Sequence, residues 1–210
     1  MTDRWIPESE FHRIYGPQQP LTPLEARELM AGLEVPWWVA GGWALEAFTG
    51  VSRHHEDIDL SVLRRDEAPV RRHLEPRFHL WAAGDGLKHL TPETPMPPQA
   101  EQIWFREHAL APWRGEVLLN PDADGRWLSK RDPGFSAPIE QVTWSRDGVL
   151  YLRPEIVLTH KAKNTRPKDD ADFEAALPLL DRAAGELLAE SLATYAADHP
   201  WRARLAASTG

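Results

Sequence analysis

Apolar positions along the chain follow two different periods, and the change between them divides the molecule into two parts. Short apolar runs with the alternation typical of strands occur before residue 152, interleaved with helical stretches. From Pro154 the pattern is helical, with a further helix start at Pro167. The pattern therefore predicts an α/β (α+β) domain over residues 1–152 and a helical C-terminal lobe over residues 153–210.

Local signals give the bounds of the elements. Thr22 and Glu25 form a capping box around Pro23, which predicts a helix start. Asp147-Gly148 between apolar runs predicts a hairpin. Residues 84–100, rich in Gly and Pro, predict a loop that is either a binding lid or a plain surface insertion. The expected strands are 37–40, 57–63, 77–82, 116–120, 142–144 and 149–152, with 126–130 paired to 116–120. The expected helices are 22–32, 42–48 (closed by Gly50), 66–74 (capped by Asp66) and 185–195, besides those at Pro154 and Pro167.

Composition narrows the class of protein. The 210 residues contain no apolar run of 18, so we expect no transmembrane helix. The first residues lack an apolar signal core, so we expect no secretion. The absence of cysteine excludes disulfides and thiolate metal ligands, and is consistent with a cytoplasmic protein.

The net charge of −8 bears on possible partners. Proteins that bind long nucleic acids usually present a basic surface, so an acidic chain argues against a polynucleotide partner. The charge suits a cationic small molecule, although solubility alone is an equally simple explanation. The sequence leaves the oligomeric state open.

The most informative stretch holds a Gly41-Gly42 turn followed by Asp57 and Asp59. Side chains two residues apart on a strand point the same way, about 6.6 Å apart along the backbone. Two such carboxylates repel each other unless a cation lies between them, and hard oxygen ligands suit Mg²⁺ bound to phosphates. Free N–H groups at Gly41 and Gly42 can bind phosphate oxygens. The stretch predicts a nucleotide and Mg²⁺ site, and Trp43 is expected to be the tryptophan nearest to it.

These residues carry a family resemblance. GGWALEAFTG…RHHEDIDLSV resembles the nucleotidyltransferase-fold antibiotic-modifying enzymes, in particular the aminoglycoside 2''-nucleotidyltransferase and lincosamide nucleotidyltransferase group. The resemblance is specific over residues 37–63 and weaker over 113–119 and 154–180. It implies a nucleotidyltransferase (polymerase-beta-like) fold, with a small mixed sheet and flanking helices. It also implies transfer of a nucleoside monophosphate from an NTP such as ATP to an antibiotic hydroxyl.

A third carboxylate is expected beside the two aspartates, and Glu116 is the best candidate. The family often has aspartate at the matching place, so Glu116 departs from the pattern. Glutamate can still bind the metal ion, accept the proton of the acceptor hydroxyl, or do both. The alternative is a surface strand glutamate. Asp122 and Asp124 are rival candidates, but they belong to a turn.

Basic residues are expected to complete the site. Arg53 contacts the triphosphate or braces Glu46, and His55 is expected to hold an aspartate. A zinc site at His54 and His55 is disfavoured, because adjacent strand residues point to opposite faces. Lys161, Arg166 and Lys168 can reach the triphosphate, with Asp169 and Asp172 bracing them from one helix face. The alternative is a helical hairpin with solvated charges.

Three functions are compatible with these residues. The first is Mg²⁺-dependent nucleotidyl transfer to an aminoglycoside- or lincosamide-like acceptor. The second is a toxin-type nucleotidyltransferase that modifies tRNA or protein, against which the acidic charge counts. The third is a non-catalytic nucleotide-binding relative, which the departure at Glu116 keeps open.

Overall fold

The computed structural model describes residues 8–131 and 134–208. Its centre is an eight-stranded mixed sheet with the strand order β10-β11-β1-β2-β6-β5-β3-β4. A small second sheet has the order β7-β8-β9. The strands are β1 Trp38–Val39, β2 Asp59–Leu63, β3 His79–Gly84, β4 Gly86–Leu90, β5 Gln102–Arg106, β6 Gly115–Asn120, β7 Asp122–Ala123, β8 Arg126–Leu128, β9 Ser136–Ala137, β10 Thr143–Arg146 and β11 Val149–Leu152.

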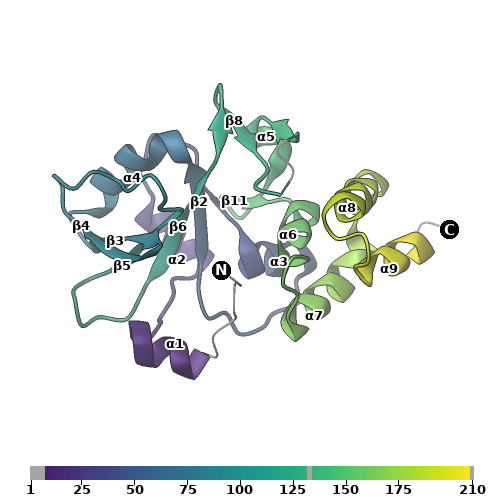
Figure 1. The fold of residues 1–210 in the computed structure, drawn as a ribbon, viewed down its shortest axis with the longest axis horizontal. Coiled ribbons are helices and arrows are strands. Elements are labelled where there is room, and N and C mark those ends of the chain that lie inside the picture. The colour runs from purple at the N-terminus through teal and green to yellow at the C-terminus, as the bar shows by residue number, and fades with distance from the viewer. Residues whose placement is uncertain (1–7, 132–133, 209–210) are drawn as a thin grey trace.

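Helices flank the sheet and follow it. The last four lie side by side at one end of the molecule, away from β3, β4 and β5 (Figure 1). The helices are α1 Glu8–Tyr15, α2 Pro23–Leu29, α3 Gly41–Thr49, η1 Arg64–Asp66, α4 Glu67–Leu74, α5 Ile139–Val142, α6 Pro154–Lys161, α7 Pro167–Ala176, η2 Leu177–Leu179, α8 Arg182–Tyr195 and α9 Trp201–Ser208. The mixed α/β architecture confirms the predicted fold class. Over residues 8–131 and 134–208, no helix is both long and apolar enough to cross a membrane.

The sheet has one apolar face and one face that carries the polar residues of interest. Leu60, Val117 and Ile103 are neighbours on β2, β6 and β5, and all three are completely buried. Because side chains alternate along a strand, Asp59 and Glu116 point to the opposite face. The same buried cluster includes Phe173 of the C-terminal helices, so the boundary at residue 152 remains a prediction.

Several local predictions are confirmed. Thr22 and Glu25 form the capping box at the start of α2. Gly50 ends α3 in the left-handed region, at φ 72°. Asp147 and Gly148 both have positive φ angles, 53° and 74°, which is the turn that suits a two-residue hairpin. Helices α6 and α7 begin at the two prolines, as predicted.

Other predictions are wrong in detail. Residues 84–100 are not one loop, because Gly86–Leu90 forms β4 and pairs with β3. Arg126–Leu128 pairs with Asp122–Ala123 in the small sheet and not with β6. Asp66 occupies the N-cap position of α4 but accepts no capping hydrogen bond. The structure also contains α1, β5 and α9, which the apolar pattern did not predict.

Candidate active site

Asp59 and Glu116 lie directly opposite each other on neighbouring strands. The parallel strands β2 and β6 pair with Asp59 in register with Glu116. Asp57 precedes β2, and Ile58 between the two aspartates is completely buried. The predicted grouping of three acids on one face is therefore present at the start of these two strands.

The two glycines of the turn make room for charged side chains. A Cβ atom on Gly41, which has φ +62°, would lie 1.8 Å from Oδ2 of Asp59. A Cβ atom on Gly42 would lie 2.2 Å from Nη2 of Arg53. Ala40 gives no side-chain cap to α3, so the first N–H groups of the helix have no side-chain acceptor there. The glycines thus bring an acid and a cation to a helix start that can bind phosphate.

The acids carry unbalanced negative charge. The crowding of protein atoms around its carboxylate, followed by repulsion from Asp59, raises the pKa of Asp57 to about 6, although the residue as a whole is exposed to solvent. Burial, followed by repulsion from and hydrogen bonding to Asp59, raises the pKa of Glu116 well above its usual range. A cation at this point would relieve the repulsion.

The donor set fits a hard divalent cation. All three groups are carboxylates, which Mg²⁺ prefers, and the raised pKa values of Asp57 and Glu116 mark a place that favours positive charge. Within the described ranges, no group of three or more carboxylate or imidazole side chains is already arranged to hold a metal ion. Because Mg²⁺ usually keeps several waters and phosphate ligands, a loose set of acids suits it.

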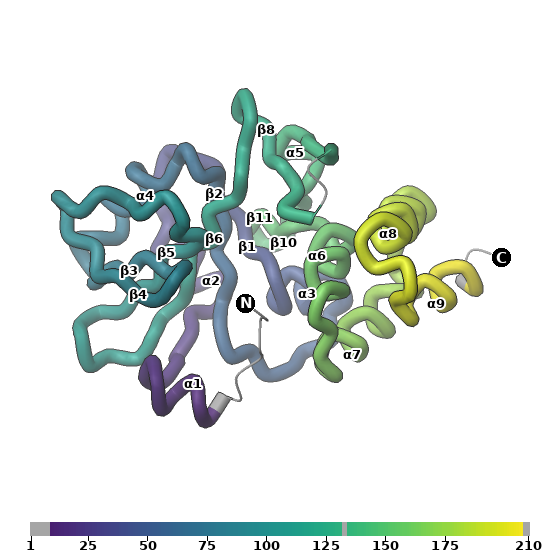
Figure 2. Tube along the Cα trace, in the orientation of Figure 1, coloured from purple at the N-terminus to yellow at the C-terminus, as the bar shows by residue number. Residues whose placement is uncertain are grey.

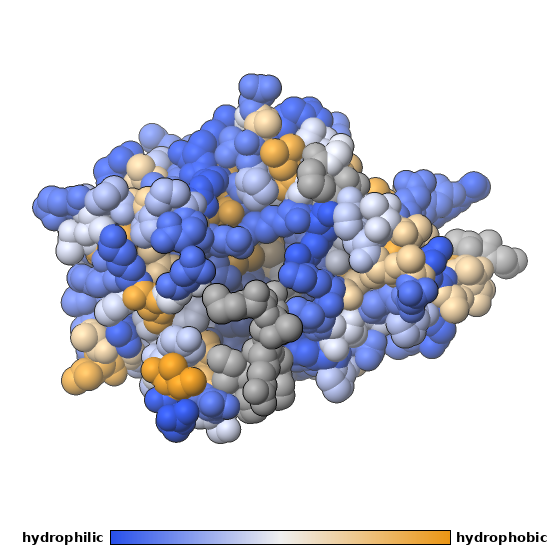
Figure 3. Space-filling view, in the orientation of Figure 1, coloured by the Kyte–Doolittle hydropathy of each residue, from blue (hydrophilic) through white to orange (hydrophobic). Residues whose placement is uncertain are grey.

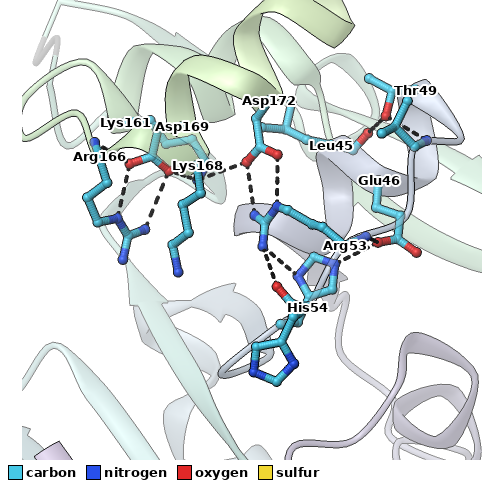
Figure 4. Close-up of polar contacts among 12 residues, drawn as sticks. Leu45, Glu46, Thr49, Arg53, His54, Lys161, Arg166, Lys168, Asp169 and Asp172 are labelled. Atoms are coloured by element: carbon cyan, nitrogen blue, oxygen red, sulfur yellow. Dashed lines mark hydrogen bonds and ion pairs between the residues drawn. The ribbon is translucent and has the colours of Figure 1, made fainter. Parts of the chain in front are cut away.

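Arg53 joins the turn to the C-terminal helices. Its Nε and Nη2 donate to the two carboxylate oxygens of Asp172 on α7, at 2.8 and 2.9 Å (Figure 4). Its backbone N–H donates to Glu46 at 3.1 Å, so the side chain does not brace Glu46 as one alternative proposed. His55 lies with Nε2 2.8 Å from Glu46, so the expectation that His55 holds an aspartate is wrong. The ring of His55 stacks on Trp43, 3.9 Å between centroids.

The predicted basic residues all have acidic partners. Lys161 pairs with Asp169 and, at 3.4 Å, with Asp172. Arg166 pairs with Asp169 at 3.0 Å. These contacts confirm the prediction that Asp169 and Asp172 brace the cations for Lys161 and Arg166, whereas Lys168 has a different partner (Figure 4). Lys168 pairs with Glu56 of the segment before β2, at 3.1 Å.

Two adjoining cavities meet at the acids. The first, of about 440 Å³, contains Gly41, Gly42 and a predominance of basic side chains. The second, of about 910 Å³, contains Glu116 and residues of α1, β4 and β5. Asp57 and Asp59 line both. In the space-filling view a hollow lies near the middle of this face, bordered by hydrophilic residues on the side of α6 and α7 (Figure 3). The basic residues of the first cavity are Arg53, Arg131, Lys161, Lys163, Arg166 and Lys168.

Some lining residues escaped the sequence analysis. Trp104, not Trp43, is the tryptophan that lines the second cavity, although Trp43 is close enough to donate to the carbonyl of Asp57 at 3.2 Å. Gln102 lies beside Trp104 on the same face of β5. The alternation of polar and buried residues over 102–106 is the signal that could have predicted this strand.

The fold and the grouping of acids correspond to the nucleotidyltransferase class. Residues 24–79 match the family described as aminoglycoside-2''-adenylyltransferase, which covers the Gly-Gly turn and both aspartates. No protein of curated function matches this chain in sequence.

Particular solved structures share the fold. Lincosamide antibiotic adenylyltransferase LnuA with lincomycin bound is similar with a TM-score of 0.51 and 16% identity, over 76% of this chain and 96% of that one. ANT(2'')-Ia in complex with adenylyl-2''-tobramycin gives a TM-score of 0.52 and 16% identity, over 83% and 95%. The solution structure of the antibiotic-resistance factor ANT(2'')-Ia gives 0.50 and 18%, over 89% and 90%. The chain therefore resembles antibiotic adenylyltransferases in fold and in its motif.

Proposed function

We propose that this protein is a Mg²⁺-dependent nucleotidyltransferase. It moves a nucleoside monophosphate from an NTP, with ATP as the donor, to a hydroxyl of a small aminoglycoside- or lincosamide-like antibiotic. One observation carries the proposal: Asp57 and Asp59 line both a basic cavity and a second cavity that contains Glu116. A triphosphate in the first cavity and an acceptor in the second would meet at these acids.

The first cavity is suited to the triphosphate. The N–H groups at Gly41 and Gly42 bind phosphate oxygens, and Arg53, Lys161 and Lys168 supply positive charge. Arg53 and Lys161 already pair with Asp172 and Asp169, which hold these two side chains in place before the nucleotide arrives.

The acids serve the metal ion and the proton. Asp57, Asp59 and Glu116 would hold Mg²⁺, which when bound neutralises the triphosphate and favours in-line displacement. Glu116 accepts the proton of the acceptor hydroxyl as the hydroxyl oxygen bonds to the α-phosphorus. The bond from that phosphorus to the bridging oxygen breaks, and pyrophosphate leaves.

The charge of the second cavity supports a cationic acceptor. Carboxylates that line it and not the first cavity are Glu56, Asp85, Glu101 and Glu116. With Asp57 and Asp59 these make six carboxylates, against four basic residues in the same lining, Lys130, Arg131, Lys163 and Arg166. The excess of carboxylates favours a cationic acceptor over a polynucleotide, which requires mainly basic contacts.

The direct test is product formation. The purified protein is incubated with Mg²⁺ and each NTP in turn, together with aminoglycosides, lincosamides or tRNA. Pyrophosphate release and a gain of one nucleoside monophosphate by the acceptor are the readouts. We expect transfer from ATP to an antibiotic, and its loss in Asp57→Asn, Asp59→Asn and Glu116→Gln. Asp122→Asn is the matched control, since Asp122 lies in the β7 turn and accepts from the Arg65 backbone at 3.3 Å.

Two results would contradict the proposal. Modification of tRNA alone would identify the toxin-type function. Binding of a non-hydrolysable ATP analogue without transfer to any acceptor would identify a nucleotide-binding relative. Calorimetric titration with the analogue, with and without Mg²⁺, separates these outcomes from a protein that binds no nucleotide.

A further inference from the structure

The row of acids continues into a row of aromatic rings. Across neighbouring strands, Glu116 on β6 is in register with Trp104 on β5, and Trp104 with Trp81 on β3. Directly paired residues point to the same face of a sheet. Trp104 therefore stands beside Glu116 on the face that carries the acids, and its side chain lines the second cavity.

Helix α1 packs on this tryptophan. The ring centroids of Phe11 and Tyr15 lie 5.6 and 5.8 Å from that of Trp104. Trp113 donates from Nε1 to the carbonyl of Tyr15 at 2.8 Å, and so ties the end of α1 to the segment before β6. Figures 1 and 2 agree that α1 lies beside the sheet half, remote from α8 and α9. Phe11, Tyr15 and Trp104 all line the second cavity, and we call these three residues the aromatic wall.

The aromatic wall lies outside the part of the chain that matches the family. That match begins at residue 24, after α1 has ended at Tyr15. The Gly-Gly turn, Asp57 and Asp59 lie within the matched segment, and Glu116 lies on β6, which pairs with β2 of that segment. Two of the three wall residues instead belong to α1, which precedes the matched segment.

The chemistry of the wall identifies what it can receive. Aromatic faces attract ammonium groups, and the attraction is strongest where water is excluded. The cavity that the wall lines is also lined by Asp85, Glu101 and Glu116, and in all it carries six carboxylates against four basic side chains. We propose that the aromatic wall is the acceptor-specificity surface, and that it receives an amino-bearing ring of the acceptor next to Glu116. This inference rests on the proposed function for the role of the second cavity.

A hydrogen-bond chain links the wall to the candidate base. Trp104 donates from Nε1 to Oε1 of Gln102 at 2.8 Å. Gln102 then donates from Nε2 to Oε1 of Glu116 at 3.3 Å. Because the indole can only donate, it fixes which end of the amide faces Glu116. Gln102 is therefore a positioning residue for Glu116, and the ring that contacts the acceptor also sets its orientation.

The test measures acceptor binding separately from nucleotide binding. Tobramycin and lincomycin are titrated calorimetrically into the wild type, Phe11→Ala and Tyr15→Ala, and a non-hydrolysable ATP analogue with Mg²⁺ is titrated in parallel. We expect each alanine variant to bind the preferred antibiotic about three- to thirtyfold more weakly, with unchanged binding of the ATP analogue. Tyr15→Phe keeps the ring and is expected to restore antibiotic affinity.

Ile14→Ala is the matched control. Ile14 lies on the same helix, is 48% exposed, and does not line the cavity. Its variant is expected to bind the antibiotic as the wild type does. Trp104→Phe keeps an aromatic ring but removes the donor to Gln102, so we expect a fall in kcat for transfer that exceeds the change in KM for the acceptor.

Different results would reject the proposed role of the aromatic wall and the proposed nucleotidyl transfer. Unchanged antibiotic affinity in both alanine variants would reject the wall while leaving transfer intact. A wild type that binds the ATP analogue but neither antibiotic would reject the wall together with the acceptor class. A wild type that binds an antibiotic through the wall but no nucleotide would reject the proposed function alone.

Discussion

Arg53 and Asp172 form a two-point ion pair between residues that are 119 positions apart in the chain. Arg53 lies in the segment between α3 and β2, and Asp172 belongs to α7. The pair therefore joins the sheet half to the C-terminal helices. Their side chains are 21% and 10% exposed. A pair so well shielded and so well aligned positions the basic side of the first cavity.

Removing Asp172 is expected to damage both stability and nucleotide binding. Asp172→Ala leaves Arg53 without its carboxylate partner in a partly buried place and leaves Lys161 with Asp169 alone, so we expect the free energy of unfolding to fall by about 2–4 kcal/mol. Urea unfolding measures this, and titration with an ATP analogue is expected to show weaker binding. Glu186→Gln, which breaks the exposed pair of Arg182 and Glu186, is the control and is expected to leave the free energy of unfolding almost unchanged. Equal effects of the two variants would contradict the role of Asp172.

Gly41 is expected to tolerate no side chain. In Gly41→Ala the new Cβ atom would meet Oδ2 of Asp59 at 1.8 Å, in a backbone region that favours glycine. Displacing a carboxylate that is proposed to hold the metal ion by about 1 Å can cost a factor of about 100 in rate, so transfer should fall at least that far. Gly50→Ala has a similar positive φ but no atom within 4 Å, and should cost about 1–2 kcal/mol of stability with activity retained. Normal turnover by Gly41→Ala would refute the placement of Asp59.

Neutralising Glu56 is expected to change the affinities for the two substrates in opposite directions. Lys168 pairs with Glu56 at 3.1 Å, and Glu56 also lines the second cavity. In Glu56→Gln, Lys168 no longer has a competing anion, so the KM for ATP should fall about two- to fivefold, in line with a partly exposed ion pair. The KM for a cationic antibiotic should rise. Steady-state kinetics with each substrate varied in turn measures the two KM values. If both KM values changed in the same direction, the assignment of the cavities would be contradicted.

His160 is expected to make the protein sensitive to mild acid. Burial, followed by repulsion from Arg131 and Lys130, lowers the pKa of His160 to about 4. In the unfolded chain a histidine titrates near 6.5, so the unfolded state takes up the proton first as the pH falls. Stability is therefore complete above about pH 6.5 and declines towards pH 4, by on the order of 2–3 kcal/mol.

The contribution of His160 can be isolated by substitution. His160→Gln should flatten the decline in urea midpoint between pH 6.5 and pH 4, whereas His79→Gln, at an exposed histidine, should leave it unchanged. Parallel pH profiles for the wild type and His160→Gln would show that other groups set the acid sensitivity.

Local chemistry explains why parts of this fold were predictable. The period-2 pattern around Asp57 and Asp59 placed Ile58 and Leu60 in the core, and both are completely buried. Thr22 with Glu25, and Asp147 with Gly148, set their turns through contacts within a few residues. Such signals act over short separations, so the sequence alone carries them.

The remainder depended on long-range contacts. The partner of Arg53 is Asp172, far along the chain, and no local pattern distinguishes it from Glu46 as a partner. His55 contacts Glu46 because α3 turns back beside it, which the spacing does not reveal. The predicted pairing of residues 126–130 with β6 is wrong for the same reason, because the turn at 122–125 does not reveal that β8 pairs with β7 and β9 in a separate sheet. The roles of Asp57, Asp59 and Glu116 stay predictions until the variants are measured.

The direct pairing of β2 with β6 has a consequence for how this protein can be redesigned. Residues 64–114 form one excursion that leaves β2 after Leu63, adds β3, β4 and β5 to the sheet, and returns to the start of β6 beside Asp59. An exchangeable cassette of this kind can vary in length and shape while the acids stay opposite each other. Its one requirement is register, because a slip of a single residue would turn Glu116 towards the core. New acceptors can therefore be sought by exchanging that cassette together with α1, without altering the residues that are proposed to carry the chemistry.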